Sequence, residues 1–382
     1  MCQATDALRE AAAFDPDVQA PIVSSPIRRA PRRAPEGSNR LILLGTAGGG
    51  NPKNTRYGFS NAVVVGETAY IIDCGEGVHH QAWKSGISMH PSRRPAGGST
   101  VAAIFLTHLH ADHVIDYANL LMGFWPVQPV EVFGPGQAGL PIATYPPGRV
   151  VDPLYPEEPT PGIRGLTDHL FRAFAYNINT RIADEGRHDV TKMVNVHEIG
   201  LRHGSYKPDI DLGVVASGTS MESCAPAMDP VIIYPTDANG VQISCILVQH
   251  APVFPAMAYR VDTPTGSIVI SGDTGPCDNV VRLAEGADVL VHEVIDVAFL
   301  AERVAKLPNR DGIIKHLTES HTSPADAGRI AQRAGVKTLV MSHLVPGDDE
   351  IAEADWESRA RPYFDGEVVC GVDLDQFALL GR

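Results

Sequence analysis

The fold of this chain is organised around the stretch Ile104-Phe-Leu-Thr-His-Leu-His-Ala-Asp-His113. Its apolar start predicts a strand, and a helix-like spacing of apolar residues follows it. His108 and His110 are two residues apart, so in an extended segment their side chains point the same way. Asp112 and His113 fall where the helix begins, and both can turn back toward the same space. The stretch therefore predicts one shared polar site at the end of a strand.

These four side chains form a donor set typical of a transition-metal site. Imidazole and carboxylate ligands suit Zn²⁺, Mn²⁺ or Fe, whereas Ca²⁺ and Mg²⁺ prefer shells made of oxygen alone. The composition, with 15 His and 45 Asp+Glu in 382 residues, predicts roughly 0.003 chance matches to His-x-His-x-Asp/Glu-His. A helix cap made of polar residues is the simpler alternative, but the rarity of the pattern favours a metal site.

Further His and Asp residues recur directly after apolar strands in the second half of the chain. His250, Asp273, His292 and His343 all occupy this position. Strand ends can meet at one edge of a sheet, so these groups can converge on the first cluster. Four such positions are difficult to explain as isolated structural residues.

The combined motifs resemble the metallo-β-lactamase superfamily in its dinuclear hydrolase form. They are His108-x-His-x-Asp-His113, His250, Gly272-Asp-Thr274 and Ser342-His343, and the resemblance covers about residues 40–382. It implies an α/β fold of four layers, an αββα sandwich, with two metal ions at one end. The expected cofactor is two Zn²⁺ per chain, with Mn²⁺ or Fe as alternatives. The resemblance assigns His108, His110 and His250 to one metal, Asp112, His113 and His343 to the other, and Asp273 to both.

Two further elements are similar to those of ribonuclease Z and its relatives. They are Val291-His-Glu293 and Ser320-His-Thr322. The resemblance implies that His321 donates a proton to the leaving group and that Glu293 orients and charges its imidazole, as a carboxylate partner can. With Asp112 they form the predicted catalytic set. The implied reaction is attack by a metal-bridging hydroxide on a sulfur, phosphorus or carbonyl centre.

The chain departs from ribonuclease Z in features connected with the substrate. Those enzymes carry a projecting basic arm for tRNA and a Ser-Arg-Tyr-type run after the last His ligand. Here Leu344-Val-Pro346 follows that ligand, and the insertion at about 135–235 is proline-rich and slightly acidic. With the segment from His250 to Arg260, these features look more like the arylsulfatase-like hydrolases related to ribonuclease Z. The prediction is therefore a small-molecule ester substrate, such as an aryl sulfate, phosphodiester or lactone, with nucleic acid disfavoured.

Two other functions remain open. A ribonuclease Z-type tRNA 3′-end endonuclease is the main alternative, and cleavage of precursor tRNA would discriminate it. A non-catalytic protein on the same fold is disfavoured because every ligand position is filled. Fewer than one tightly bound metal per chain would revive that third hypothesis.

Composition limits the compartment and the partners. The formal net charge of −14 repels nucleic acid unless basic residues are concentrated locally. Six Cys without a Cys-x-x-Cys pair predict reduced thiols and a cytoplasmic location. No apolar run reaches the ~18 residues of a membrane span, so no membrane partner is expected. A homodimer is expected only by analogy with relatives.

The local patterns predict one domain over 40–382, preceded by a mobile tail over 1–39. Helices are expected at 112–124, 164–180, 296–306 and 324–334, and a Pro-rich excursion over 135–163 without helix. Residues 46–52 form a Gly-rich stretch that is either a loop at the mouth of the site or a tight turn. The insertion also offers three aromatic residues as pocket walls or as core packing: Phe171, Phe174 and Tyr176.

Overall fold

The structure is a computed structural model that describes residues 29–139, 141–213 and 225–380. Two sheets run through it, with their strands in the following spatial order. The first sheet contains β16 (Gln376–Ala378), β1 (Arg40–Gly45), β2 (Ser60–Val65), β3 (Thr68–Ile72), β5 (Ser99–Phe105), β6 (Val130–Pro135), β7 (Val194–Gly200) and β8 (Ile210–Asp211), with β4 (Ile87–Ser88) paired to β5. The second contains β15 (Glu367–Cys370), β14 (Thr338–Val345), β13 (Val289–Ile295), β12 (Gly266–Ile270), β11 (Met257–Thr263), β10 (Gln242–Leu247) and β9 (Val231–Tyr234).

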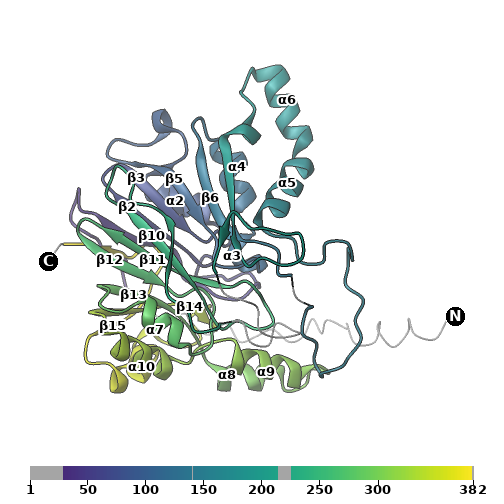
Figure 1. The fold of residues 1–382 in the computed structure, drawn as a ribbon. Helices are drawn as coiled ribbons and strands as arrows, with labels where there is room; N and C mark the ends of the chain where they lie inside the picture. The colour runs from purple at the N-terminus through teal and green to yellow at the C-terminus, as the bar shows by residue number, and fades with distance from the viewer. Residues whose placement is uncertain (1–28, 140, 214–224, 381–382) are drawn as a thin grey trace.

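Helices cover the outer faces of both sheets, which confirms the predicted αββα sandwich (Figure 1). On the first sheet lie α2 (Val78–Lys84), α4 (Tyr117–Phe124) and α5 (Ile163–Ala173), and on the second lie α7 (Asp278–Leu283), α10 (Pro324–Ala334) and α11 (Glu353–Ala360). The remaining helices are α3 (Ala111–Val114), α6 (Ala175–Glu185), α8 (Val297–Val304) and α9 (Arg310–Glu319), with the short 3₁₀ turns η1 (Pro91–Arg93), η2 (Val190–Met193) and η3 (Arg361–Tyr363).

The core between the sheets follows from the two-residue period of each strand. In β1, Leu41 and Leu43 face the second sheet, whereas Ile42 and Leu44 face the outer helices. All four side chains are fully buried, and burying a side chain of this size contributes roughly 1.5–3 kcal/mol to stability. The strand is therefore apolar at successive positions because both of its faces are covered.

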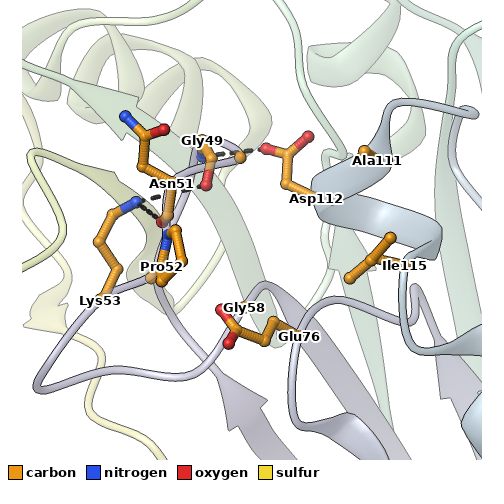
Figure 2. A pocket seen from close by; sticks show the side chains of 11 residues that line it. Gly49, Asn51, Pro52, Lys53, Gly58, Glu76, Ala111, Asp112 and Ile115 are labelled. Atoms are coloured by element: carbon orange, nitrogen blue, oxygen red, sulfur yellow. Dashed lines mark hydrogen bonds between the residues drawn. The ribbon is translucent and has the colours of Figure 1, made fainter. Parts of the chain in front are cut away.

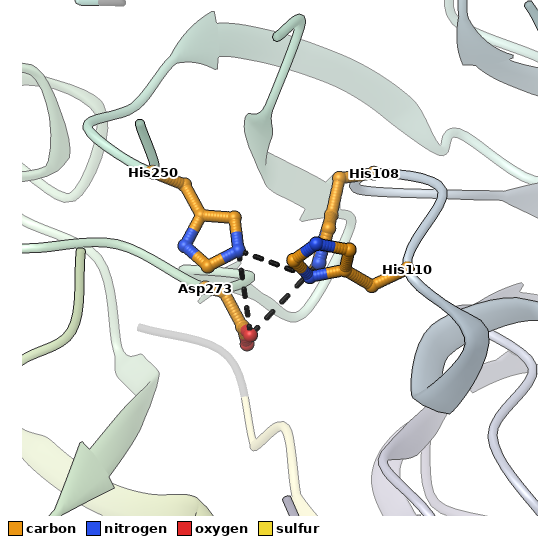
Figure 3. Close-up of side chains that lie close together, drawn as sticks. All are labelled: His108, His110, His250 and Asp273. Atoms are coloured by element: carbon orange, nitrogen blue, oxygen red, sulfur yellow. Dashed lines mark hydrogen bonds and ion pairs between the residues drawn. The ribbon is translucent and has the colours of Figure 1, made fainter. Parts of the chain in front are cut away.

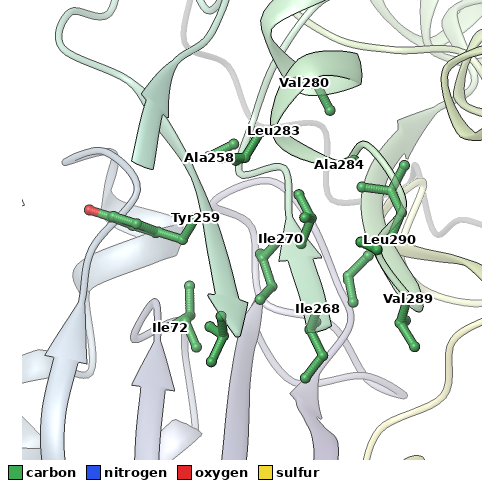
Figure 4. Packing of buried hydrophobic residues seen from close by; sticks show 14 of the residues in the cluster. Ile72, Ala258, Tyr259, Ile268, Ile270, Val280, Leu283, Ala284, Val289 and Leu290 are labelled. Atoms are coloured by element: carbon green, nitrogen blue, oxygen red, sulfur yellow. The ribbon is translucent and has the colours of Figure 1, made fainter. Parts of the chain in front are cut away.

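Figure 4 shows the apolar packing of the second sheet beneath α7. Ile268 and Ile270 of β12 lie on the same face of the sheet as Tyr259, because Ile270 pairs with Tyr259 and Ile268 pairs with Val261, and Val280 of α7 belongs to the same hydrophobic cluster. Tyr259 of β11 is also buried, and its hydroxyl donates a hydrogen bond of 2.7 Å to the carbonyl oxygen of Leu106. This bond ties the second sheet to the residue that precedes the predicted metal-binding stretch.

Helix α10 shows how local sequence sets an element's limits. The Ser323 hydroxyl accepts a hydrogen bond from the Asp326 amide, and Pro324 occupies the first turn. Gly335 ends the helix with a left-handed φ of 65°. These are the standard signals for a helix start and end, and the predicted helix at 324–334 is confirmed.

The helix boundaries predicted from sequence were less accurate elsewhere. The predicted helix at 112–124 is two helices, α3 and α4, and the one at 164–180 is α5 followed by α6, with Phe174 between them. Helix α9 was missed because its periodicity is weak and none of its residues is fully buried. Helices α5 and α6 project from the body of the molecule (Figure 1).

The structure bears on two further predictions, the N-terminal tail and the absence of a membrane span. Residues 1–28 of the predicted tail lie outside the described residues, and Arg29 pairs with Asp375. The described residues contain no helix that is both long and apolar enough to cross a membrane. The predicted division into a tail and one domain stays a prediction.

Candidate metal centre

The predicted ligands lie together at one edge of the two sheets. Each comes from a strand end or from the short helix after β5, so the fold brings together positions that are more than 200 residues apart in sequence. They follow β5 (His108 and His110), lie in α3 (Asp112 and His113), follow β10 (His250) and β12 (Asp273), and lie within β14 (His343).

The first group of ligands contains His108, His110, His250 and Asp273. One potential ligand atom of each lies within 4.8 Å of the others. Figure 3 shows the three imidazole rings arranged around the carboxylate. The Nε2 atoms of His108 and His250 both lie 3.9 Å from Oδ2 of Asp273. This group matches the set that the resemblance assigned to one metal.

The second group contains Asp112, His113, His343 and again Asp273. The Nε2 atoms of His113 and His343 both lie 3.2 Å from Oδ1 of Asp273. His343 Nε2 is also 3.4 Å from Oδ2 of Asp112. Asp273 therefore presents one oxygen to each group, which is the arrangement that a bridging carboxylate requires.

The donor atoms of both groups fit divalent cations. His108 Nε2, His113 Nε2 and Asp273 Oδ1 are buried and have no hydrogen-bond partner in the described part of the chain. Buried polar atoms without a partner are rare, and their convergence calls for a cation. Burial also holds the pKa values of His108 and His250 well below the ordinary value, so both imidazoles are neutral, as metal ligands must be.

A β-bulge in β14 sets the direction of the His343 side chain. Glu293 of β13 pairs with Ser342, and the next residue, Val294, pairs with Leu344. His343 is the extra residue between them, and its φ is +48°, a left-handed value uncommon outside glycine. The bulge takes His343 out of the regular alternation of the strand and places its ring among the second group of ligands.

Asp73, which sequence reasoning missed, supports two ligand-bearing segments. Its carboxylate accepts hydrogen bonds from His113 Nδ1 at 2.9 Å, from the Thr107 amide at 2.7 Å and from the Thr107 hydroxyl at 2.8 Å. The first bond fixes His113 with Nε2 facing the centre. A signal was present, because Asp73 directly follows the apolar strand β3, much as Asp273 lies shortly after β12.

Replacing Asp73 by Asn is expected to weaken metal binding by roughly 10- to 100-fold, the usual effect of removing support behind a ligand. The amide would place a donor against groups that already donate. Chelator competition on the purified variant measures the affinity. Asp168→Asn, an exposed carboxylate on α5, is the control, and wild-type affinity in Asp73→Asn would refute this supporting role.

The Gly-rich stretch at 46–52 lies against the second group of ligands. The Gly49 amide donates a hydrogen bond of 2.9 Å to Oδ2 of Asp112. A Cβ atom on Gly48 would lie 2.4 Å from Nδ1 of His343. Figure 2 shows this loop facing Asp112 across a cavity of about 300 Å³, with Lys53 on the far side. Of the two alternatives, the loop at the mouth of the site is the one that these contacts support.

Gly48→Ala is expected to displace the His343 ring and to weaken metal binding by roughly 10- to 100-fold without unfolding the chain. The physical reason is the overlap of the added methyl group with the imidazole. Gly50→Ala is a matched control, because nothing lies within 4 Å of a Cβ there. Elemental analysis after gel filtration gives the metal content, and equal contents in both variants would contradict the prediction.

His321 and Glu293 form the predicted pair beside the ligands. Nδ1 of His321 donates to Oε1 of Glu293 at 2.9 Å, and Asp273 lies within reach of both. Burial lowers the pKa of His321, but the charge and hydrogen bond of Glu293 raise it to about 9 overall. The Thr274 amide also donates to Glu293, at 3.1 Å. His292 lies apart from the ligand groups, and its Nδ1 donates to the Glu293 carbonyl oxygen at 2.8 Å.

Comparison with known proteins shows extensive sequence similarity. Residues 55–160 match the metallo-beta-lactamase superfamily. The chain is 31% identical over 334 residues to Ribonuclease Z of Mycobacterium bovis (strain BCG / Pasteur 1173P2), which covers 87% of this chain and 96% of that protein. It is 32% identical over 334 residues, with the same coverage, to Ribonuclease Z of Mycobacterium avium (strain 104).

Solved structures show a similar fold. The metallo-beta-lactamase fold protein YhfI from Bacillus subtilis superposes with a TM-score of 0.52 at 15% identity, covering 89% of this chain and 99% of that one. Human tRNase Z, short form, superposes with a TM-score of 0.52 at 19% identity and the same coverage. At these identities the similarity is one of fold alone.

Two sequence-based predictions are wrong in the light of these relatives. The preference for a small-molecule ester substrate rested on a few residues after two ligands and on the insertion. Similarity to Ribonuclease Z extends over 334 residues. The view that nucleic acid is disfavoured rested on net charge, which is a property of the whole chain. The two candidate ligand groups contain only two carboxylates, Asp112 and Asp273, so divalent cations bound there would make the site locally positive whatever the total charge.

Other predictions are confirmed at the level that the relatives support. The superfamily match and the two ligand groups show a divalent-metal hydrolase, and the similarity to arylsulfatases is not supported. Sequence identity above 30% across nearly the whole length of the relatives is decisive for family membership. The chain belongs to the ribonuclease Z family of the metallo-β-lactamase superfamily.

Proposed function

We propose that this protein is a ribonuclease Z-type endonuclease that hydrolyses a phosphodiester bond near the 3′ end of precursor tRNA. The observation that carries the proposal is 31% identity to Ribonuclease Z over 334 residues. The convergence of two ligand groups on Asp273 supports it, because paired metals are typical of enzymes that cleave phosphodiesters. A ribonuclease substrate also accords with a locally positive centre.

The proposed cofactor is two Zn²⁺ ions per chain. Five imidazoles and two carboxylates make up the ligands, a donor set that Zn²⁺ favours over Ca²⁺ or Mg²⁺. One ion would be held by His108, His110 and His250, the other by Asp112, His113 and His343, with Asp273 shared. Elemental analysis of protein purified without added metal tests the identity, and iron or manganese in place of zinc would correct it.

In the proposed chemistry, the metals would activate water and the protein side chains would supply a proton. When bound, a metal pair lowers the pKa of water toward ~7 and neutralises charge on a phosphate. The attacking water loses one proton to solvent and its oxygen bonds to phosphorus, the bond to the leaving oxygen breaks, and that oxygen takes a proton from His321, which is protonated again from solvent. Glu293 holds the Nδ1 proton of His321, which leaves Nε2 to carry the proton that is transferred. Asp112, the third residue of the predicted catalytic set, would act as a ligand of one metal.

Cleavage of precursor tRNA by protein of known metal content tests the proposal. We expect a single cut near the 3′ end of the mature tRNA, lost on treatment with chelator and restored by Zn²⁺. An aryl sulfate, a bis-aryl phosphate and a lactone are tested in parallel. Failure to cut precursor tRNA by a preparation that holds two metals and hydrolyses one of the small esters would overturn the proposal.

A cytoplasmic location is part of the same proposal. The described cysteines Cys74, Cys245, Cys277 and Cys370 are all free thiols, and three of them are buried. Reduced, unpaired cysteines are usual in a reducing compartment. Fractionation of cells that express the protein at its natural level tests this location.

A further inference from the structure

A second cavity of about 550 Å³ lies beside the metal centre, on the His110 side. This volume falls in the range of about 300–1,000 Å³ that is usual for small-ligand sites. One wall is the proline-rich segment of the insertion, which connects β6 to α5 and on its way reaches α9 (Figure 1). The opposite wall is α9, and the loop after His250 closes the remaining side. No role has been assigned so far to the segment or to α9.

Tyr145 is the aromatic wall of this cavity. A Cβ atom on Gly312 of α9 would lie 3.0 Å from the Tyr145 ring, so the ring rests directly against the helix backbone. Its exposed fraction is 43%, which leaves a large part of the ring open to a ligand. Pro147 and Pro252 add flat apolar surface. The cavity is therefore mainly apolar and carries one exposed ring.

Polar groups line the side of the cavity nearest the metal ligands. His316 of α9 lies with its ring centroid 5.6 Å from that of His250 and 5.3 Å from that of His321. His110, a predicted ligand, also lines the cavity. Lys315 adds a positive charge and pairs with Glu319 one turn later. A ligand in this cavity would lie next to the reacting group.

We infer that this cavity binds the nucleobase of a nucleotide next to the scissile phosphate, stacked on Tyr145. The inference rests on the proposed function and names a contact within that substrate. A base has a flat π-face that stacks on aromatic rings without regard to sequence. It also has polar edges that neutral or charged side chains such as His316 and Lys315 can bind. The sugar and phosphate would then point toward the metal ligands.

The three aromatic residues that sequence reasoning offered either as pocket walls or as core packing do not form this wall. Phe171 packs in the core of the first sheet's outer face, and Tyr176 of α6 is 85% exposed. Neither these residues nor Phe174 line the cavity. Tyr363 of η3 is a suitable control, since it is a tyrosine of similar exposed fraction, 40%, that lies outside both the cavity and the projecting helices.

Single-turnover cleavage of precursor tRNA gives the first test. Tyr145→Ala should lower the rate constant at subsaturating enzyme by about 5- to 150-fold, the loss typical of one base–aromatic stack. Tyr363→Ala should cleave at the wild-type rate. A second set of substrates lacks the base of one nucleotide, either just before or just after the cleavage site. For one of these two positions, the missing base should lower the cleavage rate constant of the wild-type enzyme by a similar factor. The same missing base should not lower the rate constant of Tyr145→Ala any further.

Binding of small ligands gives a second test that does not depend on cleavage. Adenosine 5′-monophosphate and ribose 5-phosphate are titrated into metal-loaded wild-type protein and the same two variants by calorimetry. We expect the nucleotide to bind more tightly than the sugar phosphate, and only Tyr145→Ala to remove the difference. Unfolding temperatures of both variants are compared with wild type to show that they are folded.

The outcomes separate this inference from the proposed function. Nucleotide binding that depends on Tyr145, without any cleavage of precursor tRNA, would support the base-binding cavity and overturn the nuclease. Cleavage that is unchanged in Tyr145→Ala on normal and abasic substrates would overturn the cavity and keep the nuclease. Equal binding of nucleotide and sugar phosphate would also overturn the cavity as a nucleobase site.

Discussion

Asp273→Asn is expected to reduce bound metal below two ions per chain and to lower cleavage by on the order of 10³-fold or more. Oδ1 of this residue faces His113 and His343, and Oδ2 faces His108 and His250. An amide has one oxygen in place of two, and its NH₂ group would face a cation. Loss of a metal removes several kcal/mol of transition-state stabilisation, and each 1.36 kcal/mol is a factor of ten in rate.

Metal content and precursor tRNA cleavage are measured on the same preparation. Asp262→Asn is the matched control, because that carboxylate lies on β11 of the same sheet, pairs with Arg260 and is 40% exposed. The control should hold two metals and cleave at the wild-type rate. Two tightly held metals and normal cleavage in Asp273→Asn would show that the carboxylate is not shared between two ions.

His321→Ala is expected to lower cleavage of precursor tRNA by about 10²- to 10⁴-fold, the usual contribution of a positioned acid. The leaving oxygen of a ribose is a poor leaving group without a proton. Metal content should not change, because the ligand set that the resemblance implies does not include His321, although its ring lies beside His250 and Asp273. A structural role in holding the metals would instead lower metal content and cleavage together.

The leaving group decides whether His321 acts as an acid. A bis-aryl phosphate with a nitrophenol leaving group needs little protonation, so His321→Ala should lose far less activity on it than on RNA. Glu293→Gln should show the same pattern with a smaller loss, since the amide cannot charge the imidazole. His169→Ala, an exposed histidine of α5, is the control. Equal losses of His321→Ala on both substrates would rule out proton donation.

The candidate ligand residues could be predicted because the residues next to them in sequence mark their positions. His250 follows β10 and Asp273 follows β12, and several His and Asp residues in such positions are unlikely to be isolated structural residues. The His108–His113 stretch is specific by itself, since its residue types and spacing seldom occur by chance. Local signals of this kind do not depend on how the rest of the chain folds.

Elements and features without a strong local signal were missed or misjudged. Helix α9 has no fully buried residue, so its sequence shows little amphipathic pattern, yet it supplies a wall of the second cavity. The substrate was misjudged because short runs near the ligands and the total charge were given more weight than similarity along the whole chain. Net charge does not describe the field at a site that binds cations.

By itself, the sequence determined the identity of the candidate ligands, because short motifs are local properties, and the resemblance that those motifs carry implied the αββα architecture. The tertiary structure alone decided how the side chains of those candidate ligands are oriented. The bulge that directs His343, the division of Asp273 between two groups and the support from Asp73 all depend on strands distant in sequence. The placement of Tyr145 against Gly312 depends on the same kind of contact. Such contacts arise from packing between segments, which no pattern within one segment can specify.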